Sequence, residues 1–312
     1  MTKIAIIGSG LIGRAWATIF ASHGFDVALH DVAPGAAEAA RAHISSNLEE
    51  LAGHGLVEDP RGSLARIRVA SGLADALNGA DLVQENGPEA VETKRALFAE
   101  MDRLAAPETI LASSTSFIMA SVFSETLPGR ARCLVAHPVN PPHLVPIVEL
   151  APAPWTDPAV LARAKAIYEQ AGQVPIVLRK EKPGFVLNRL QAVLLAEAFR
   201  LVGEGVASAE DVDKTIRDGL GLRWSFMGPF ETIELNAPGG IPDYCARYGA
   251  SIATMAAQAV GGDPFGAETV ATVMSEWPGT QSAERVKRLS DWRDTRLAAL
   301  QAHKRAAARK PA

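Results

Sequence analysis

The sequence has only two cysteines, Cys133 and Cys245, among its 312 residues. Two widely separated cysteines cannot build a disulfide framework, and their spacing does not suit a metal centre. We therefore predict no metal site. Such sparing use of cysteine fits the reducing environment of the cytosol, so we expect a cytoplasmic location.

The chain also lacks any run of about 18 uninterrupted apolar residues, which a membrane-spanning helix needs. Nor does it carry excess positive charge, because 31 Lys and Arg stand against 35 Asp and Glu, for a net charge of −4. A protein that neutralises a row of phosphates needs a basic surface. Membranes and nucleic acids are therefore not expected partners. The composition, 48% hydrophobic and 21% charged, excludes disorder and collagen.

Short β-branched runs alternate with longer Ala- and Leu-rich segments through the first 150 residues. This alternation predicts a mostly parallel sheet that is covered by helices on both faces. Strands are expected at Lys3–Ile7, Asp26–His30, Ile67–Ala70, Leu82–Glu85, Ile110–Ser113, Cys133–Ala136 and Ile147–Leu150.

The pattern changes at residues 181–184, where a charged pair precedes a Pro-Gly turn signal. From Phe185 to Glu204 the apolar residues recur at spacings of three and four, the period of a helix with one buried face. The rest is also rich in Ala and Leu. Since one core stops growing at about 250 to 300 residues, we predict two domains. Residues 1–183 form the α/β domain, and residues 184–312 form an all-helical domain.

A glycine-rich motif, GSGLIG, occupies residues 8–13, between the first strand and a helical segment. Gly8 allows a tight turn, Gly10 lets the backbone approach a pyrophosphate, and Gly13 lets helix and strand pack closely. Asp31 ends the next strand, where a carboxylate accepts hydrogen bonds from an adenine ribose. No Arg or Lys follows within residues 32–36 to pair with a 2′-phosphate. The motif predicts a Rossmann-type domain that binds NAD rather than NADP.

A histidine and a glutamate form a candidate acid–base pair. His137 ends a strand before a Pro-rich loop, and Glu149 lies twelve residues further on, in an apolar strand where an unpaired carboxylate is costly to bury. A Glu bonded to one ring nitrogen of His137 leaves the other nitrogen able to take a proton. A single histidine near prolines is, however, more often structural.

Two further polar features are open to more than one interpretation. The hydroxyls of the SSTS run at residues 113–116 could cap the next helix as easily as they could hold a substrate. Asn188 interrupts the apolar face of the first helix after the domain break, so it needs a partner in a cleft or in the core.

Together these segments resemble the L-3-hydroxyacyl-CoA dehydrogenase superfamily and, within it, the L-gulonate 3-dehydrogenase and lambda-crystallin branch. The resemblance covers nearly the whole chain. It rests on GSGLIG, SSTS, AHPVNPP at 136–142, VEL at 148–150, GFVLNRLQ at 184–191, GLGLR at 219–223 and WRD at 292–294.

The resemblance implies that His137 and Glu149 are a catalytic pair and that Ser116 and Asn188 hold the reacting oxygen. It also implies an NAD site. Its lining would be Gly8, Gly10, Leu11, Ile12, Gly13, Asp31, Glu89 and Lys94. Glu89 and Lys94 would otherwise be read as surface charges.

One departure from the acyl-CoA branch concerns the substrate. That branch has a Lys-rich helical region after the second strand, suited to the phosphates of CoA, whereas residues 4–93 here contain no Lys. Four arginines remain in the part of that stretch that follows the second strand, Arg41, Arg61, Arg66 and Arg68. We further hypothesise that Arg223 forms a bidentate pair with a substrate carboxylate. A packing or interface role for Arg223 is the alternative.

The sequence therefore predicts an NAD-dependent dehydrogenase that oxidises the 3-hydroxyl of a short free hydroxy acid, with L-gulonate the leading candidate. One alternative is a 3-hydroxyacyl-CoA dehydrogenase, for which 3-hydroxybutyryl-CoA is the natural test. Another is a non-catalytic, crystallin-like NAD-binding protein, for which the four catalytic candidates would be unnecessary. We expect a homodimer formed through the helical domain.

Overall fold

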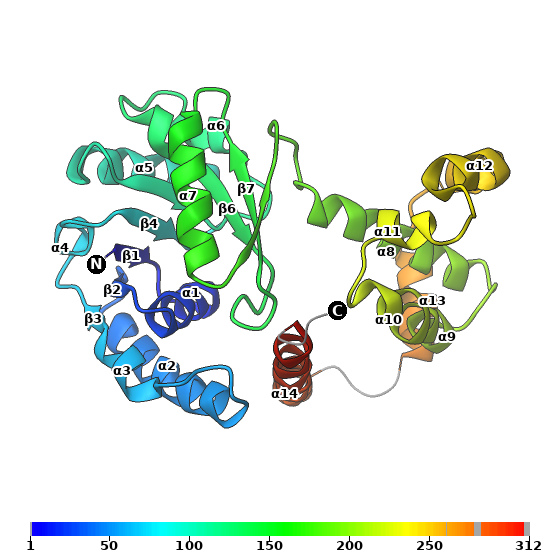
Figure 1. Ribbon diagram of the computed structural model, residues 1–312, viewed down its shortest axis with the longest axis horizontal. Coiled ribbons are helices and arrows are strands. Elements are labelled where there is room, and N and C mark those ends of the chain that lie inside the picture. The colour runs from blue at the N-terminus through cyan, green and yellow to red at the C-terminus, as the bar shows by residue number, and fades with distance from the viewer. Residues whose placement is uncertain (1, 260, 278–281, 309–312) are drawn as a thin grey trace. The chain divides into compact units, whose positions relative to one another are not determined.

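The computed structural model describes residues 2–259, 261–277 and 282–308 (Figure 1). The chain forms two compact units. Unit 1 comprises the residues up to Val186 together with the segment that begins at Ser282, and unit 2 comprises the residues between them. The sequence-based boundary at residues 183 and 184 stays a prediction, and the structure groups the C-terminal segment with unit 1.

Unit 1 is built on one eight-stranded sheet with the order β3-β2-β1-β4-β5-β6-β7-β8. The strands are β1 (Lys3–Ile7), β2 (Asp26–His30), β3 (Ile67–Val69), β4 (Leu82–Glu85), β5 (Ile110–Ser113), β6 (Cys133–Pro138), β7 (Ile147–Pro152) and β8 (Val174–Val177). Strands β1 to β6 are parallel, β7 is antiparallel to β6, and β8 is parallel to β7. The predicted Rossmann-type, mostly parallel sheet is confirmed, with all seven expected strands.

Strand β8 is the one that the sequence pattern did not reveal. It is short, contains Pro175 and lies at the edge of the sheet. A proline has no amide hydrogen for the ladder and is tolerated at an edge, so the segment does not carry an ordinary strand signal.

Helices cover both faces of the sheet, because successive side chains of a strand point to opposite sides. Ile4 and Ile6 of β1 contact one core cluster, and Ala5 and Ile7 contact the other. The first cluster is completed by α1 (Leu11–Ser22), α2 (Ala36–Gly53), α7 (Pro158–Gln170) and α14 (Ala283–Ala308). The second is completed by α4 (Leu73–Leu77), α5 (Val91–Leu104) and α6 (Ala120–Ser124). The remaining helices of unit 1 are α3 (Pro60–Ala65) and the 3-10 helix η1 (Arg130–Arg132).

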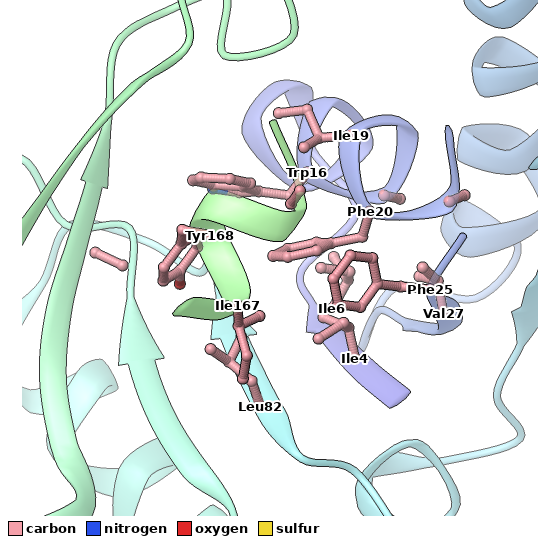
Figure 2. Close-up of a cluster of buried hydrophobic side chains, with 14 of the residues drawn as sticks. Ile4, Ile6, Trp16, Ile19, Phe20, Phe25, Val27, Leu82, Ile167 and Tyr168 are labelled. Carbon is pink, nitrogen blue, oxygen red and sulfur yellow. The ribbon is translucent and has the colours of Figure 1, made fainter. Parts of the chain in front are cut away.

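An aromatic group fixes α1 and α7 against the sheet (Figure 2). Trp16 stacks on Phe20 with ring centroids 5.5 Å apart, and Tyr168 of α7 lies 5.4 Å from Trp16. All three rings are fully buried. Because α1 begins at the glycine loop, this packing also determines where the first turn of that helix lies.

The regular secondary structure of unit 2, within its described residues, consists of helices joined by loops. Its elements are α8 (Leu187–Gly203), α9 (Ala209–Lys214), a π-helix (Thr215–Leu220), α10 (Gly221–Trp224), α11 (Pro229–Glu234), α12 (Gly240–Gln258) and α13 (Ala267–Glu276). Helices α8 and α13 approach closely, since a Cβ added at Gly203 would lie 2.9 Å from the Thr269 side chain. The predicted all-helical character of this part of the chain is confirmed.

The predicted buried face of α8 is mostly exposed among the described residues. Of its apolar side chains only Val202 is buried, whereas Leu190 and Val193 are 66% and 69% exposed. The spacing of apolar residues identified the helix correctly, but periodicity cannot say whether a face is covered within the chain or by another molecule.

Candidate active site

The glycine loop has the tight geometry that its spacing predicts. Gly8 has a positive φ of 90°, and a Cβ there would lie 2.8 Å from the Asn86 carbonyl oxygen. A Cβ on Gly13 would lie 1.9 Å from the Gly8 carbonyl oxygen. At Gly10, in contrast, a Cβ would meet nothing within 4 Å. Gly10 is the N-cap of α1, so open space lies beside the amide groups that begin this helix.

Asp31, at the end of β2, is held beside this loop. Its carboxylate accepts hydrogen bonds from the Ser9 amide (2.7 Å), the Ser9 hydroxyl (2.8 Å) and the Ala33 amide (2.9 Å). Partial burial raises the pKa of Asp31, but these hydrogen bonds outweigh it and lower the pKa below its ordinary value. The side chain is therefore an anion at neutral pH, suited to accept hydrogen bonds from ribose hydroxyls.

A cavity of about 830 Å³ opens between these groups. Gly8, Gly10 and Asp31 line it together with Asn86 and Pro88. Its size is within the range of cofactor pockets. A glycine loop, a helix N-terminus and an anionic carboxylate fit the diphosphate and ribose of NAD. Of the other expected residues, Leu11 is exposed at the start of α1, and Ile12 packs partly against the core.

Lys94 has a structural role that its sequence context did not reveal. It is 1% exposed, and its ammonium donates to both carboxylate oxygens of Glu85, at 3.0 Å each. Glu85, at the end of β4, also accepts hydrogen bonds from the Gly87 amide and the Ser113 hydroxyl. This buried network supports the loop after β4. Lys94 thus contributes to the cofactor cavity through Glu85 rather than by a side chain that faces the cavity.

The first three residues of the SSTS run after β5 make structural hydrogen bonds, and the role of the fourth, Ser116, stays a prediction. Ser113 binds Glu85, and the Ser114 hydroxyl donates to Asn86 and accepts from Trp16 and Gln84. Thr115 donates to Glu89, which is 41% exposed and also lies 3.9 Å from Lys94. Ser116 is half-buried. Asn86 and Glu85 were not predicted, although both follow directly from the end of β4.

His137 and Glu149 are brought together by the β6–β7 ladder. They are register partners in these antiparallel strands, and His137 Nδ1 lies 2.9 Å from Glu149 Oε2. Both are buried, at 4% and 1% exposed. Because an ionised carboxylate only accepts hydrogen bonds, Nδ1 carries the hydrogen and Nε2 is left as the acceptor. The arrangement can therefore accept a proton at Nε2 and stabilise the resulting imidazolium.

The same carboxylate holds the segment at which the chain passes from unit 1 to unit 2. The Val186 amide donates to Glu149 Oε1 at 2.9 Å. Preceding it, Phe185 is the only non-glycine residue with positive φ among the described residues, and its ring lies 5.3 Å from the His137 ring. Phe185 is 1% exposed. This turn therefore shields one side of the pair and directs an amide at its carboxylate.

Two of the predicted site residues belong to unit 2. Asn188 is the second residue of α8 and half-buried, and Arg223 is exposed in the short helix α10. Ser116, His137 and Glu149 lie in unit 1. The roles of Asn188 and Arg223 stay predictions.

Family models match along most of the chain. The model of the NAD-binding domain of 3-hydroxyacyl-CoA dehydrogenase matches residues 3–182, and that of the C-terminal domain of the same enzyme matches residues 184–276. The chain belongs to the 3-hydroxyacyl-CoA dehydrogenase family. The resemblance drawn from the motifs is confirmed. This member of the family is an NAD-dependent oxidoreductase that acts on a hydroxyl group.

Individual relatives cover most of the chain. A lambda-crystallin homolog from Bos taurus is 46% identical to this chain. The match covers 79% of this chain and 77% of the homolog. An L-carnitine dehydrogenase from Pseudomonas putida is 38% identical over 80% and 77%. The crystal structure of an NAD⁺-dependent 5-formyl-3-hydroxy-2-methylpyridine-4-carboxylic acid 5-dehydrogenase matches with a TM-score of 0.82 and 29% identity, covering 96% and 98% of the two chains. Among the described residues of this dehydrogenase, no helix is both long and apolar enough to cross a membrane.

The glycine loop gives a first prediction. Gly13→Ala should lower the melting temperature and weaken NAD binding, because the added methyl collides with the Gly8 carbonyl. Gly10→Ala should leave the melting temperature unchanged yet weaken NAD binding by about tenfold or more, since its methyl would occupy space that a diphosphate needs. Thermal unfolding and NAD titration measure both effects.

Gly53→Ala, where a Cβ also meets nothing within 4 Å, is the matched control. It should retain normal NAD binding. A Gly10→Ala variant that binds NAD as tightly as the parent would contradict the placement of the diphosphate at this loop.

Proposed function

We propose that this dehydrogenase oxidises the 3-hydroxyl of a short free hydroxy acid, with L-gulonate, converted to 3-dehydro-L-gulonate, as the leading candidate. The observation that carries the proposal is the lack of available cations in the region after β2, where an acyl-CoA enzyme would need them for phosphates. No Lys occurs in residues 4–93.

The arginines of that region support the same conclusion, because three of the four are already engaged. Arg41 donates to the backbone carbonyls of Ile67 (2.9 Å) and Leu64 (3.4 Å). Arg66 pairs with Asp26 at 3.6 Å, and Arg68 donates to both carboxylate oxygens of Asp75 at 3.0 Å. A polyphosphate ligand would have to compete with each of these contacts.

The names of two groups of relatives support a free acid as the substrate. The L-carnitine dehydrogenase of Pseudomonas putida is named for a free 3-hydroxy acid, and the lambda-crystallin homologs match the branch to which the motifs point. A non-catalytic role is the weaker alternative, because a structural protein has no need of a buried His–Glu pair whose second ring nitrogen is left as an acceptor.

In the proposed mechanism, His137 Nε2 takes the proton of the substrate hydroxyl as the carbon–hydrogen bond breaks. Bound NAD would supply the acceptor for the hydride that leaves that carbon. Glu149 holds His137 in the required tautomer and stabilises its positive charge through the 2.9 Å hydrogen bond. Ser116 and Asn188 orient the substrate oxygen, and Arg223 is the candidate that the sequence offers for pairing with a carboxylate. Among the cofactor contacts, Asp31 takes the ribose and Leu11, Ile12 and Glu89 complete the NAD site, while Lys94 supports the site through Glu85.

A substrate panel tests the proposed function. NAD reduction should be observed with L-gulonate and with other short free acids such as 3-hydroxybutyrate or carnitine, at a higher kcat/KM than with 3-hydroxybutyryl-CoA. Activity confined to the thioester would overturn the proposal in favour of the acyl-CoA alternative. Absence of any turnover would favour the non-catalytic one.

The role of His137 gives a separate prediction. His137→Ala should bind NAD normally but lose at least about two decades of kcat, the usual range for a general base. His303→Ala, an exposed histidine on α14, serves as the control and should keep full activity. Near-normal turnover by His137→Ala would show that another group takes the proton.

We also propose that the chain forms a homodimer through its helical unit. The exposed apolar face of α8, with Leu190 and Val193, needs a cover in water, and a second copy of the same face provides a self-complementary one. Light scattering should give the mass of two chains for the parent and of one for Val193→Asp. Val174→Asp, at an equally apolar exposed site on β8, should remain dimeric. A parent protein with the mass of one chain would refute the dimer.

A further inference from the structure

The C-terminal helix α14 closes a second cavity in unit 1. Ala298 of this helix is 3% exposed within the first core cluster, and Arg305 donates to the Leu56 carbonyl oxygen at 3.0 Å. Between α14, α1, α2 and the loop after β6 lies a cavity of about 650 Å³. It is distinct from the cavity lined by Gly8 and Asp31, although Leu11, beside the glycine loop, belongs to its wall.

The cavity borders the loop that follows the strand carrying His137. Asn140 and His143, three and six residues beyond His137, contribute to its wall. Its position next to the catalytic strand and the start of α1 is that of a substrate subsite in an open α/β sheet, where ligands bind beyond the carboxyl ends of the strands.

Arg14 supplies an unsatisfied cation to this cavity. The side chain is half-buried, and within the described residues its guanidinium donates no hydrogen bond and forms no ion pair. The cavity is also lined by Lys287 and Arg293, and each of these cations is paired with a carboxylate. The Lys287 ammonium lies 2.7 Å from Asp291, and the Arg293 guanidinium lies 2.7 Å from Asp294. The carboxylate of Glu50 also lines the cavity but is exposed and outside ion-pair distance of Arg14. A partly buried guanidinium without a counter-ion is available to form a charge-assisted pair with an anionic ligand.

His143 adds a second unsatisfied group. Its Nδ1 atom is buried and has no hydrogen-bond partner in the described part of the chain. Burial lowers the pKa of His143, more than the nearby Asp294 carboxylate raises it, so the ring is neutral at neutral pH. A neutral imidazole can donate a hydrogen bond to a carboxylate or to a hydroxyl without repelling either.

The rest of the wall is mixed in character. Asn47, Asn140, Ser290 and Thr295 offer hydrogen-bond donors and acceptors, whereas Leu11, Ala15, Leu51, Pro141, Leu144 and Ala298 are apolar. Among the described residues, no Phe, Trp or Tyr lines the cavity. The four polar side chains suit a ligand that carries hydroxyls.

We propose that this cavity binds a free, hydroxyl-rich carboxylic acid, with Arg14 pairing to the carboxylate and the loop and α14 contacting the hydroxyls. The inference deepens the proposed function, on which it rests, by assigning Arg14 rather than Arg223 as the specificity-determining cation. It also assigns α14 a part in substrate selection.

Ligand-induced stabilisation tests the assignment without activity. L-Gulonate should raise the melting temperature of the parent, since a ligand that binds only the folded state stabilises it, and the neutral L-gulono-1,4-lactone should not. Arg14→Gln should abolish the shift, and Arg14→Lys, which keeps the charge, should restore part of it. Arg296→Gln, an exposed arginine on α14 outside the cavity, should behave as the parent.

Kinetics give the second readout. Arg14→Gln should raise the KM for the free acid about tenfold to a hundredfold, as expected for a lost charge-assisted hydrogen bond, and leave the Kd for NAD unchanged. Ser290→Phe, which narrows the cavity from α14 without altering α1, should raise the same KM. Arg223→Gln should leave the gulonate-induced rise in melting temperature unchanged.

The outcomes separate the two proposals. An equal shift in Arg14→Gln and the parent, an equal shift from acid and lactone, or no shift in the parent would overturn the assignment of the cavity even if free acids are turned over. An Arg14-dependent shift with turnover of the thioester alone would support the cavity as a carboxylate site and refute the proposed function.

Discussion

The arrangement of unit 1 at its catalytic edge depends on the buried carboxylate of Glu149. One oxygen accepts the hydrogen of His137 Nδ1, and the other accepts the amide hydrogen of Val186, the residue at which the chain leaves unit 1. At 1% exposure the carboxylate has little contact with water, so these donors must balance the cost of burying its charge. The Glu149 carboxylate therefore fixes both the orientation of the His137 imidazole and the point at which the chain leaves the sheet. The left-handed backbone of Phe185 is part of the same constraint, since it turns the Val186 amide toward the oxygen.

Much of this organisation could be predicted from the sequence, because it depends on local rules. Buried parallel strands appear as short apolar runs, and a glycine spacing that tolerates no Cβ at Gly8 or Gly13 appears as a motif. The contact between His137 and Glu149 was also within reach, since two strands joined by a short loop pair in antiparallel fashion. What local rules could not supply was the register that places the two residues directly opposite each other.

Other features depend on contacts between distant segments, which no local pattern encodes. Lys94 looks like a surface charge in sequence, yet it is buried because Glu85, from a different element, is buried beside it. Helix α14 has the pattern of an ordinary polar helix but contributes Ala298 to the core of a unit formed mainly by the first 186 residues. Arg14 likewise gains its significance from the cavity that α14 encloses and not from its neighbours in sequence. Strand β8, with Pro175, was missed because edge strands tolerate residues that interior strands exclude.

The β6–β7 hairpin keeps the His137–Glu149 pair apart from the residues that line the second cavity. His137 and Glu149 are attached to the ladder itself, whereas Asn140 and His143 lie in the connection between the strands, residues 139–146, and line the second cavity. Changes of length or composition in that connection can therefore alter which molecule is admitted while the hydrogen bond across the ladder remains in place. Loops tolerate insertions far better than the strands they join. A scaffold of this kind can change the lining of its second cavity over evolutionary time while it keeps the candidate acid–base pair of His137 and Glu149 intact.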